Sequence, residues 1–192
     1  MIEPDAVAAI LLAAGRSSRF GTADKLLTPL QGMPVARHAA KPIVELTPAR
    51  RIAICPDADD ALAHMLAGEG FDIIANPAAE RGLSESLRLG IAAVQSGTES
   101  AALLCLADMP FVRAEHLAAL LARFDPHEAP VVASGRDGVP MPPALFARSL
   151  FAELANARGD QGGRALLASA VLVPAPAGQL GDIDRPGDLP SD

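Results

Sequence analysis

Residues 7–25 read VAAILLAAGRSSRFGTADK, an unbroken apolar run followed by a turn that holds two glycines and three cationic side chains. The core of the run, AAILLA (8–13), does not alternate apolar with polar residues. This pattern is typical of a strand that is covered on both faces. The segment AALLCLA (101–107) has the same character. Strands of this kind occur in parallel sheets that carry helices on both faces.

Longer amphipathic stretches separate the apolar runs along the chain. This alternation predicts an α/β fold, a three-layer αβα sandwich built on a Rossmann-like, mostly parallel sheet. The length favours a single domain over residues 1–192. We expect strands at Val7–Ala13, Arg51–Cys55, Phe71–Ala75, Ala101–Leu106, Pro130–Ser134 and Val171–Val173, and helices at Pro34–Leu46, Asp57–Ala67, Ser84–Gln95, Ala114–Phe124, Pro143–Ala157 and Gly162–Ser169.

Composition excludes several classes of protein. The formal net charge is −7, and the aromatic residues amount to 3%, all of them Phe. An acidic surface repels a phosphate backbone, and single strands find few stacking partners here, so we expect no nucleic-acid partner. The longest apolar stretch, 6–14, is too short to span a bilayer. It follows two acidic residues, unlike a signal peptide, so we expect a cytoplasmic protein without membrane association.

The two cysteines, Cys55 and Cys105, lie fifty residues apart in apolar runs. This spacing matches neither a metal site nor a redox motif. We interpret both as buried thiols, with a disulfide as the less favoured alternative.

The turn after the first strand is the strongest functional signal. In an open parallel sheet, ligands bind outside the carboxyl ends of the strands. Glycines allow tight backbone paths there, and a nest of N–H groups binds anions. Arg16, Arg19 and Lys25 add the positive charge that a triphosphate requires. The turn is neither a P-loop nor G-x-G-x-x-G, and an ordinary turn with solvated arginines is the alternative.

Asp108 follows the apolar strand at 101–106 directly. A carboxylate held there can bind Mg²⁺, which takes few carboxylates together with phosphate oxygens and water. The alternative is an N-cap for the helix expected from Ala114. Asp182 and Asp184 lie two positions apart in the tail, and either could complete a metal site. A solvated acidic turn explains them equally well.

Two further segments carry polar groups suited to a nucleotide or a phosphate. Glycines before a helix with a nearby arginine suit a second phosphate, although a plain turn capped by an aspartate explains the same pattern. An asparagine and serines after the third strand could bind a base or ribose, and turn and cap duties are equally possible. The first group is Asp160, Gly162 and Arg164, and the second is Asn76, Gly82, Ser84 and Ser86.

Residues 12–25, L-A-A-G-R-S-S-R-F-G-x-x-x-K, resemble the signature of the MobA-like nucleotidyltransferases. Further segments look like family blocks in the expected order, so the resemblance covers nearly the whole chain. Within the family, the chain is most similar to the molybdenum cofactor cytidylyltransferases. The further segments are Asn76-Pro77 through Ser86, Leu106-Ala107-Asp108-Met109-Pro110, Gly159-Asp160 through Arg164, and Asp182-Ile183-Asp184-Arg185-Pro186.

The resemblance implies a fold of the nucleotide-diphospho-sugar transferase type and transfer of CMP from CTP to molybdopterin, with release of pyrophosphate. It implies Mg²⁺ on Asp108, joined by Asp184, and a molybdoenzyme or its chaperone as a partner protein. Arg19 and Lys25 would stabilise charge on the leaving pyrophosphate. The residues implied to hold the nucleotide in this first segment are Leu12, Ala13, Ala14, Gly15, Arg16, Ser17, Ser18 and Gly21.

Two positions bear on specificity. Members that use cytidine resemble Leu-Ala-Ala-Gly, whereas members that use guanosine resemble Leu-Ala-Gly-Gly, and the methyl group of Ala14 would narrow the base pocket. Cytidylyl members often read Gly-His-Pro before Leu-Phe, where this chain reads M-P-P-A-L-F at 141–146. This departure bears on the acceptor more than on the chemistry.

Two other functions remain compatible with these residues. One is a related nucleotidyltransferase that uses GTP, or that uses a sugar or polyol phosphate as acceptor. The other is a non-catalytic module that binds a nucleotide or a pterin. Asp108 beside a cationic turn favours catalysis, because a pure binding protein gains little from a metal carboxylate.

Overall fold

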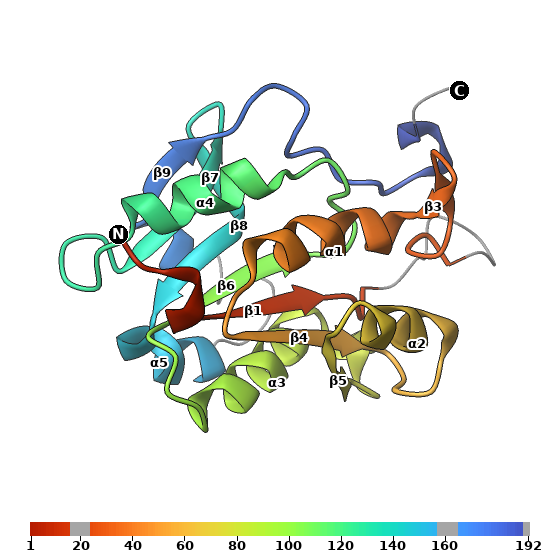
Figure 1. The fold of residues 1–192 in the computed structure, drawn as a ribbon, viewed down its shortest axis with the longest axis horizontal. Coiled ribbons are helices and arrows are strands. Elements are labelled where there is room, and N and C mark those ends of the chain that lie inside the picture. Colours follow the sequence, from red (N-terminus) through yellow and green to blue (C-terminus); the bar gives the residue numbers. More distant parts are fainter. Residues whose placement is uncertain (16–23, 157–164, 190–192) are drawn as a thin grey trace.

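The computed structural model describes residues 1–15, 24–156 and 165–189. The described residues form a mixed seven-stranded sheet, which confirms the mostly parallel sheet expected from the sequence (Figure 1). The four strands on one side are parallel, whereas the fifth is antiparallel to both of its neighbours. In spatial order the strands are β5 (Asp72–Ala75), β4 (Arg50–Cys55), β1 (Val7–Leu12), β6 (Ala101–Leu106), β8 (Val139–Ala147), β7 (Val131–Arg136) and β9 (Val171–Pro174).

Helices cover both faces of this sheet (Figure 1). Successive side chains of a strand point to opposite faces, so every residue of β1 is buried in one of two apolar cores. Ala9 and Leu11 pack in one core, and Ala8 and Ile10 pack in the other. The first core includes α1 (Val35–Leu46), α2 (Ala61–Gly68) and α4 (Ala114–Arg123), and the second includes α3 (Leu83–Gln95) and α5 (Phe151–Asn156).

A short hairpin that the sequence analysis did not predict precedes α1. It pairs β2 (Pro29–Leu30) with β3 (Met33–Pro34). Gln31 and Gly32 between these strands both have positive φ, at 49° and 82°. A two-residue turn with positive φ at both positions matches the right-handed twist of the strands it joins. The hairpin therefore lies between the turn that begins at Asp24 and the first residue of α1.

The helix expected over Pro143–Ala157 is wrong in its first part. Residues up to Ala147 belong to β8, and α5 begins only at Phe151, after the short helix η3 (Arg148–Leu150). Periodicity alone does not distinguish a short buried strand from a buried helix. The structure places residues 144–147 against β6, where all four are buried.

Cys55 and Cys105 are buried and form no disulfide, which confirms their interpretation as buried thiols. Burial raises the pKa of both thiols to about 12, and the charge of Asp60 contributes at Cys55. Both thiols are therefore protonated at neutral pH. None of the helices in the described ranges combines the length and the hydrophobicity that crossing a bilayer requires.

The carboxyl ends of the parallel strands meet at one edge of the sheet, at the right of Figure 1. The chain remains attached to neighbouring strands just beyond these ends. Three backbone hydrogen bonds show this attachment, each from an N–H group just beyond a strand to a backbone oxygen of the neighbouring strand. They run from Ala13 to Ile54, from Asn76 to Cys55, and from Ala107 to Leu12. The loops that follow β1, β5 and β6 thus begin side by side at this edge.

The approach of α3 to β1 gives a test of the packing. A Cβ added at Gly90 would lie 2.7 Å from Cγ2 of Ile10. The Ile10 side chain is β-branched and fully buried, so moving it away costs free energy. We expect Gly90→Ala to lower the free energy of unfolding by about 1 kcal/mol or more, because overpacking outweighs the better helix propensity of alanine. Denaturant unfolding measures this change.

Gly68→Ala is the matched control for Gly90→Ala. Gly68 is the exposed last residue of α2, and nothing lies within 4 Å of an added Cβ. Alanine should leave stability unchanged or raise it by up to about 0.5–1 kcal/mol. Equal effects of the two substitutions would contradict the close packing of α3 on β1.

Candidate active site

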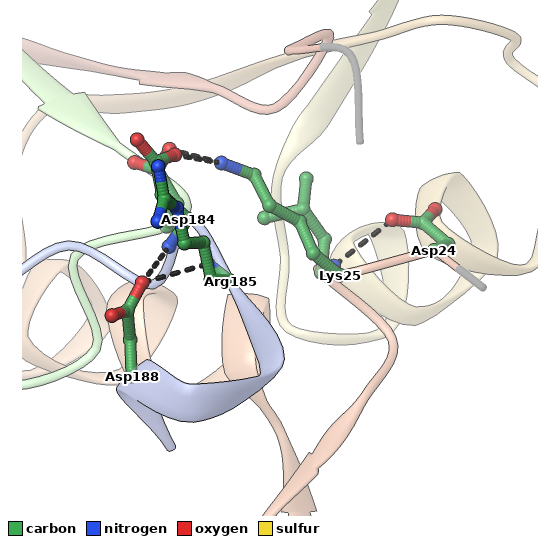
Figure 2. Close-up of polar contacts among 7 residues, drawn as sticks. Asp24, Lys25, Asp184, Arg185 and Asp188 are labelled. Carbon is green, nitrogen blue, oxygen red and sulfur yellow. Dashed lines mark hydrogen bonds and ion pairs between the residues drawn. The ribbon is translucent and has the colours of Figure 1, made fainter. Parts of the chain in front are cut away.

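The side chain of Lys25 lies between two carboxylates at the carboxyl edge of the sheet (Figure 2). Its Nζ donates to Oδ2 of Asp108 at 2.6 Å and to Oδ1 of Asp184 at 3.1 Å. Lys25 is only 5% exposed, whereas the side chain of Asp184 is 43% exposed. The sequence analysis placed these three residues in one site, and the structure brings them together.

A compact turn positions Lys25. Oδ1 of Asp24 accepts a hydrogen bond from the backbone N–H of Leu26 (Figure 2). The backbone oxygen of Asp24 accepts a hydrogen bond from the N–H of Leu27. Leu26 is 2% exposed and anchors the turn in the core. The N–H of Ala36 at the start of α1 donates to the oxygen of Leu26. The ammonium group is therefore carried by a turn that is fixed to the first helix.

Asp108 is positioned by the end of β6. Its neighbours Ala107 and Met109 are 1% and 2% exposed, so the carboxylate projects from a backbone that is anchored on both sides. The N-cap of α4 is Arg113, so the alternative role of Asp108 as a helix cap is wrong. The backbone oxygen of Asp108 accepts from the N–H of Ile183, which joins the tail to β6.

The tail folds back over the edge of the sheet and carries Asp184 to Lys25. Ile183 is fully buried beside it, whereas Asp182 is exposed. Oδ2 of Asp188 accepts from the backbone N–H groups of Asp184 and Arg185, at 2.9 and 2.7 Å (Figure 2). These two hydrogen bonds lower the pKa of Asp188 below its ordinary value.

The sequence analysis did not select Asp188. It lies four positions after Asp184, at the end of the short helix η4 (Pro186–Asp188). A carboxylate that follows a turn at this spacing can bond the backbone N–H groups of the turn. That spacing is the signal by which Asp188 could have been found.

Two opposing effects act on the pKa of Lys25. Burial by itself would lower the pKa of Lys25, but the hydrogen bonds and negative charges of Asp108 and Asp184 outweigh it, so the pKa is raised. The side chain is therefore an ammonium at neutral pH. A buried cation is stable only when it is paired and hydrogen-bonded, and the two carboxylates meet that need.

The oxygen atoms of the site fit a hard divalent cation. Oδ1 of Asp108 is buried and has no hydrogen-bond partner within the described part of the chain. The described residues include no cluster of three or more His, Cys, Asp or Glu side chains suited to a metal. Mg²⁺ commonly takes one or two carboxylates and completes its shell with phosphates and water. Asp108 and Asp184 are the residues here that match this preference.

The start of the signature segment lies at the same edge. Leu12, Ala13 and Ala14 are buried, and Gly15 follows them at the surface. Their suggested contacts with a nucleotide remain predictions. Several predicted site residues lie outside the described ranges, namely Arg16, Ser17, Ser18, Arg19, Gly21, Asp160, Gly162 and Arg164.

Asn76 and Ser86 form a buried pair beside this edge. Nδ2 of Asn76 donates to Oγ of Ser86 at 2.9 Å, and Oδ1 of Asn76 accepts from the N–H of Ala78. Asn76 therefore stabilises the turn that follows β5, which is one of the two roles predicted for it. Gly82, with φ +97° and ψ 178°, is the N-cap of α3, and Ser84 lies in the first turn of that helix. Contacts of these four residues with a base or ribose stay predictions.

Comparison with solved structures shows the fold. The structure of Rv0371C from Mycobacterium tuberculosis H37Rv in complex with manganese superposes with a TM-score of 0.77 and 22% sequence identity. The superposition covers 95% of each chain. At this level of identity, the likeness supports the Rossmann-like architecture and no finer conclusion.

Comparison of sequences shows the family. The chain is 33% identical over 127 residues to the bifunctional protein GlmU of Sphingopyxis alaskensis, covering 66% of this chain but only 28% of that protein. It is 29% identical over 122 residues to a probable molybdenum cofactor guanylyltransferase of Natronomonas pharaonis, covering 64% and 59% of the two chains. Residues 9–175 match the profile of the MobA-like NTP transferase domain. The chain therefore belongs to the family of MobA-like nucleotidyltransferases.

Proposed function

We propose that this nucleotidyltransferase transfers CMP from CTP to a terminal phosphate of molybdopterin and releases pyrophosphate. The observation that carries the proposal is the meeting of Lys25 with Asp108 and Asp184 at the carboxyl edge of the sheet. Enzymes that transfer phosphoryl and nucleotidyl groups need positive charge on the phosphates and acidic residues that hold a metal. Lys25 carries a positive charge here, and two acidic residues lie within hydrogen-bond distance of its Nζ.

In the proposed reaction, an oxygen of the acceptor phosphate attacks the α-phosphorus of the nucleotide, and the bond to pyrophosphate breaks. The nucleophile is already an anion, so no strong general base is required. The chain's own contribution is to position the reactants and to neutralise charge. The ammonium of Lys25, together with Arg19, would stabilise the negative charge that grows on the leaving pyrophosphate.

Asp108 and Asp184 would hold Mg²⁺, and Oδ1 of Asp108, which has no hydrogen-bond partner among the described residues, is the atom best suited to it. When bound, the metal supplies positive charge against the phosphate oxygens. A structural relative is described as a complex with manganese, which supports the use of a divalent cation. Asp188 would fix the turn that carries Asp184, and we assign it a positioning role.

The choice of CTP as donor rests on Ala14. Ala14 is 4% exposed at the end of the apolar run 6–14, where a methyl group would reduce the space for a purine. GTP is the second candidate, because one relative is described as a probable molybdenum cofactor guanylyltransferase. The molybdopterin acceptor is inferred from the same relative and from the sequence resemblance.

A release assay tests the donor and the acceptor together. Each of the four NTPs is combined with molybdopterin, its metal-bound form or common sugar phosphates, with and without Mg²⁺, and pyrophosphate is measured. We expect release only with Mg²⁺, with CTP and a molybdopterin acceptor as the preferred pair. Preference for GTP would overturn the donor assignment, and tight nucleotide binding without turnover would overturn catalysis.

Removing either charged group at the centre of the site should nearly stop the reaction. We expect Lys25→Ala and Asp108→Ala each to lower the rate of pyrophosphate release by about 10²–10³-fold, because Lys25 would contact the reacting phosphates and Asp108 would hold the metal that does so. Circular dichroism checks that the variants are folded. Lys41→Ala is the matched control, since Lys41 is 66% exposed on α1 and pairs only loosely with Glu45. Turnover near that of the wild type would remove the tested residue from the mechanism.

Asp188→Ala tests the positioning role. Loss of a residue that orients a metal ligand typically costs about 10–100-fold in activity, and we expect a loss of that order here. Asp188→Asn keeps an acceptor oxygen and should retain more activity. Asp59→Ala is the control, because it removes one negative charge, as Asp188→Ala does, from an exposed position before α2. Equal activity of Asp188→Ala and Asp59→Ala would refute the role.

The effect of Asp188→Ala on stability should depend on pH. The folded protein lowers the pKa of Asp188, so this carboxylate stabilises the fold above the pKa that an unfolded aspartate has. The contribution is lost as the pH falls through the lower, folded pKa. Thermal unfolding of the wild type and Asp188→Ala should therefore differ most near neutral pH and converge in acid. A difference that grows in acid would contradict this account.

A further inference from the structure

The space between Asp108 and Asp184 already holds a cation, the ammonium of Lys25. Its Nζ lies 2.6 Å from Oδ2 of Asp108 and 3.1 Å from Oδ1 of Asp184. An ammonium is a compact charge with three donors, and it can serve two carboxylates at once. The oxygen atoms proposed to bind the divalent cation are thus shared with a charged group of the chain itself.

A second cation cannot join these oxygens without opposing Lys25. Mg²⁺ binds its oxygen ligands at about 2.0–2.1 Å, so a metal on both carboxylates would lie against Nζ. Like charges at such distances repel strongly where water is scarce. Lys25 bonds Oδ2 of Asp108 and not Oδ1, but a metal held by Oδ1 alone would use one carboxylate and keep the repulsion.

We propose that Lys25 competes with the divalent cation for Asp108 and Asp184, and that the metal takes both carboxylates only when a triphosphate draws Lys25 away. The inference rests on the proposed function for the identity of the metal and the nucleotide. A triphosphate carries several negative charges and can take the place of the two carboxylates as the partner of the ammonium. Lys25 then makes the binding of metal and nucleotide mutually dependent, and such coupling is reciprocal.

This arrangement also accounts for the stability of the site before substrate arrives. Asp108 and Asp184 come from segments 76 positions apart, and without a cation their charges would repel. Lys25 offsets part of this repulsion and holds the tail against the end of β6, together with the hydrogen bond from Ile183 to the backbone oxygen of Asp108. The lysine therefore stands in for the metal in the ligand-free protein.

Titration of the full chain with Mn²⁺ alone tests the competition. Electron paramagnetic resonance follows the free ion, and no nucleotide is present. Lys25→Met removes the charge and retains much of the side-chain volume. We expect it to bind Mn²⁺ about tenfold more tightly than the wild type, or more, because the competing charge is gone. Mn²⁺ should also raise the melting temperature of Lys25→Met more than that of the wild type.

Two further variants locate the effect. Lys41→Met makes the same substitution at a side chain that is 66% exposed on α1, and it should leave the Mn²⁺ affinity unchanged. Adding Asp108→Asn to Lys25→Met should abolish the gain. Lys25→Gln, which keeps a neutral donor for the carboxylates, should behave as Lys25→Met does. Both neutral variants are prepared with Mn²⁺ present, which replaces the lost charge.

An unchanged or weaker Mn²⁺ affinity in Lys25→Met would overturn the competition. An equal gain in Lys41→Met would do the same, as would failure of both neutral variants to fold even with the metal present. The proposed function is judged separately, by pyrophosphate release from the wild type. A gain in Mn²⁺ affinity without such release refutes the function and leaves the competition standing. Release without the gain refutes the competition alone.

Discussion

The ion cluster of Lys25, Asp108 and Asp184 is the interaction on which the functional edge of this protein depends. Lys25 is separated by 83 positions from Asp108 and by 159 from Asp184 along the chain. A buried charge is costly unless it is paired and hydrogen-bonded, so the buried Lys25 depends on its two carboxylate partners. The cluster ties the turn after β1, the end of β6 and the tail into one surface. These are the groups that we propose to act, directly or through a metal, on the phosphates of the substrate.

The sheet makes this cluster possible because it places distant segments at one edge. β1 and β6 are neighbours in parallel register, with Leu12 opposite Leu106. Both strands therefore end at the same level, and the groups that follow them meet. Their side chains are divided between two apolar cores, which holds the strands rigidly. A polar site at the end of such strands inherits that rigidity, since the interior packs too tightly to adjust.

The limits of sequence analysis are clear at β8 and in the tail. The buried residues 144–147 fit a helix as well as a strand, and only pairing with β6 decides between them. The acidic segment at 182–184 fits an exposed turn as well as a site. The hydrogen bonds from Ile183 to Asp108 and from Lys25 to Asp184 bring this segment to the edge of the sheet. Such long-range bonds leave no periodic pattern in the chain.

The sequence by itself determined the α/β class, the family and the two signals at Lys25 and Asp108, because apolar runs and local motifs are properties of neighbouring residues. Tertiary structure decided which carboxylate joins them and which residue orients it. Asp184 reaches Lys25, whereas Asp182 is exposed, because burial of Ile183 sets the path of the tail. Which of Asp182 and Asp184 faces Lys25 depends on where the tail folds back onto the sheet, and the packing of the tail determines that position.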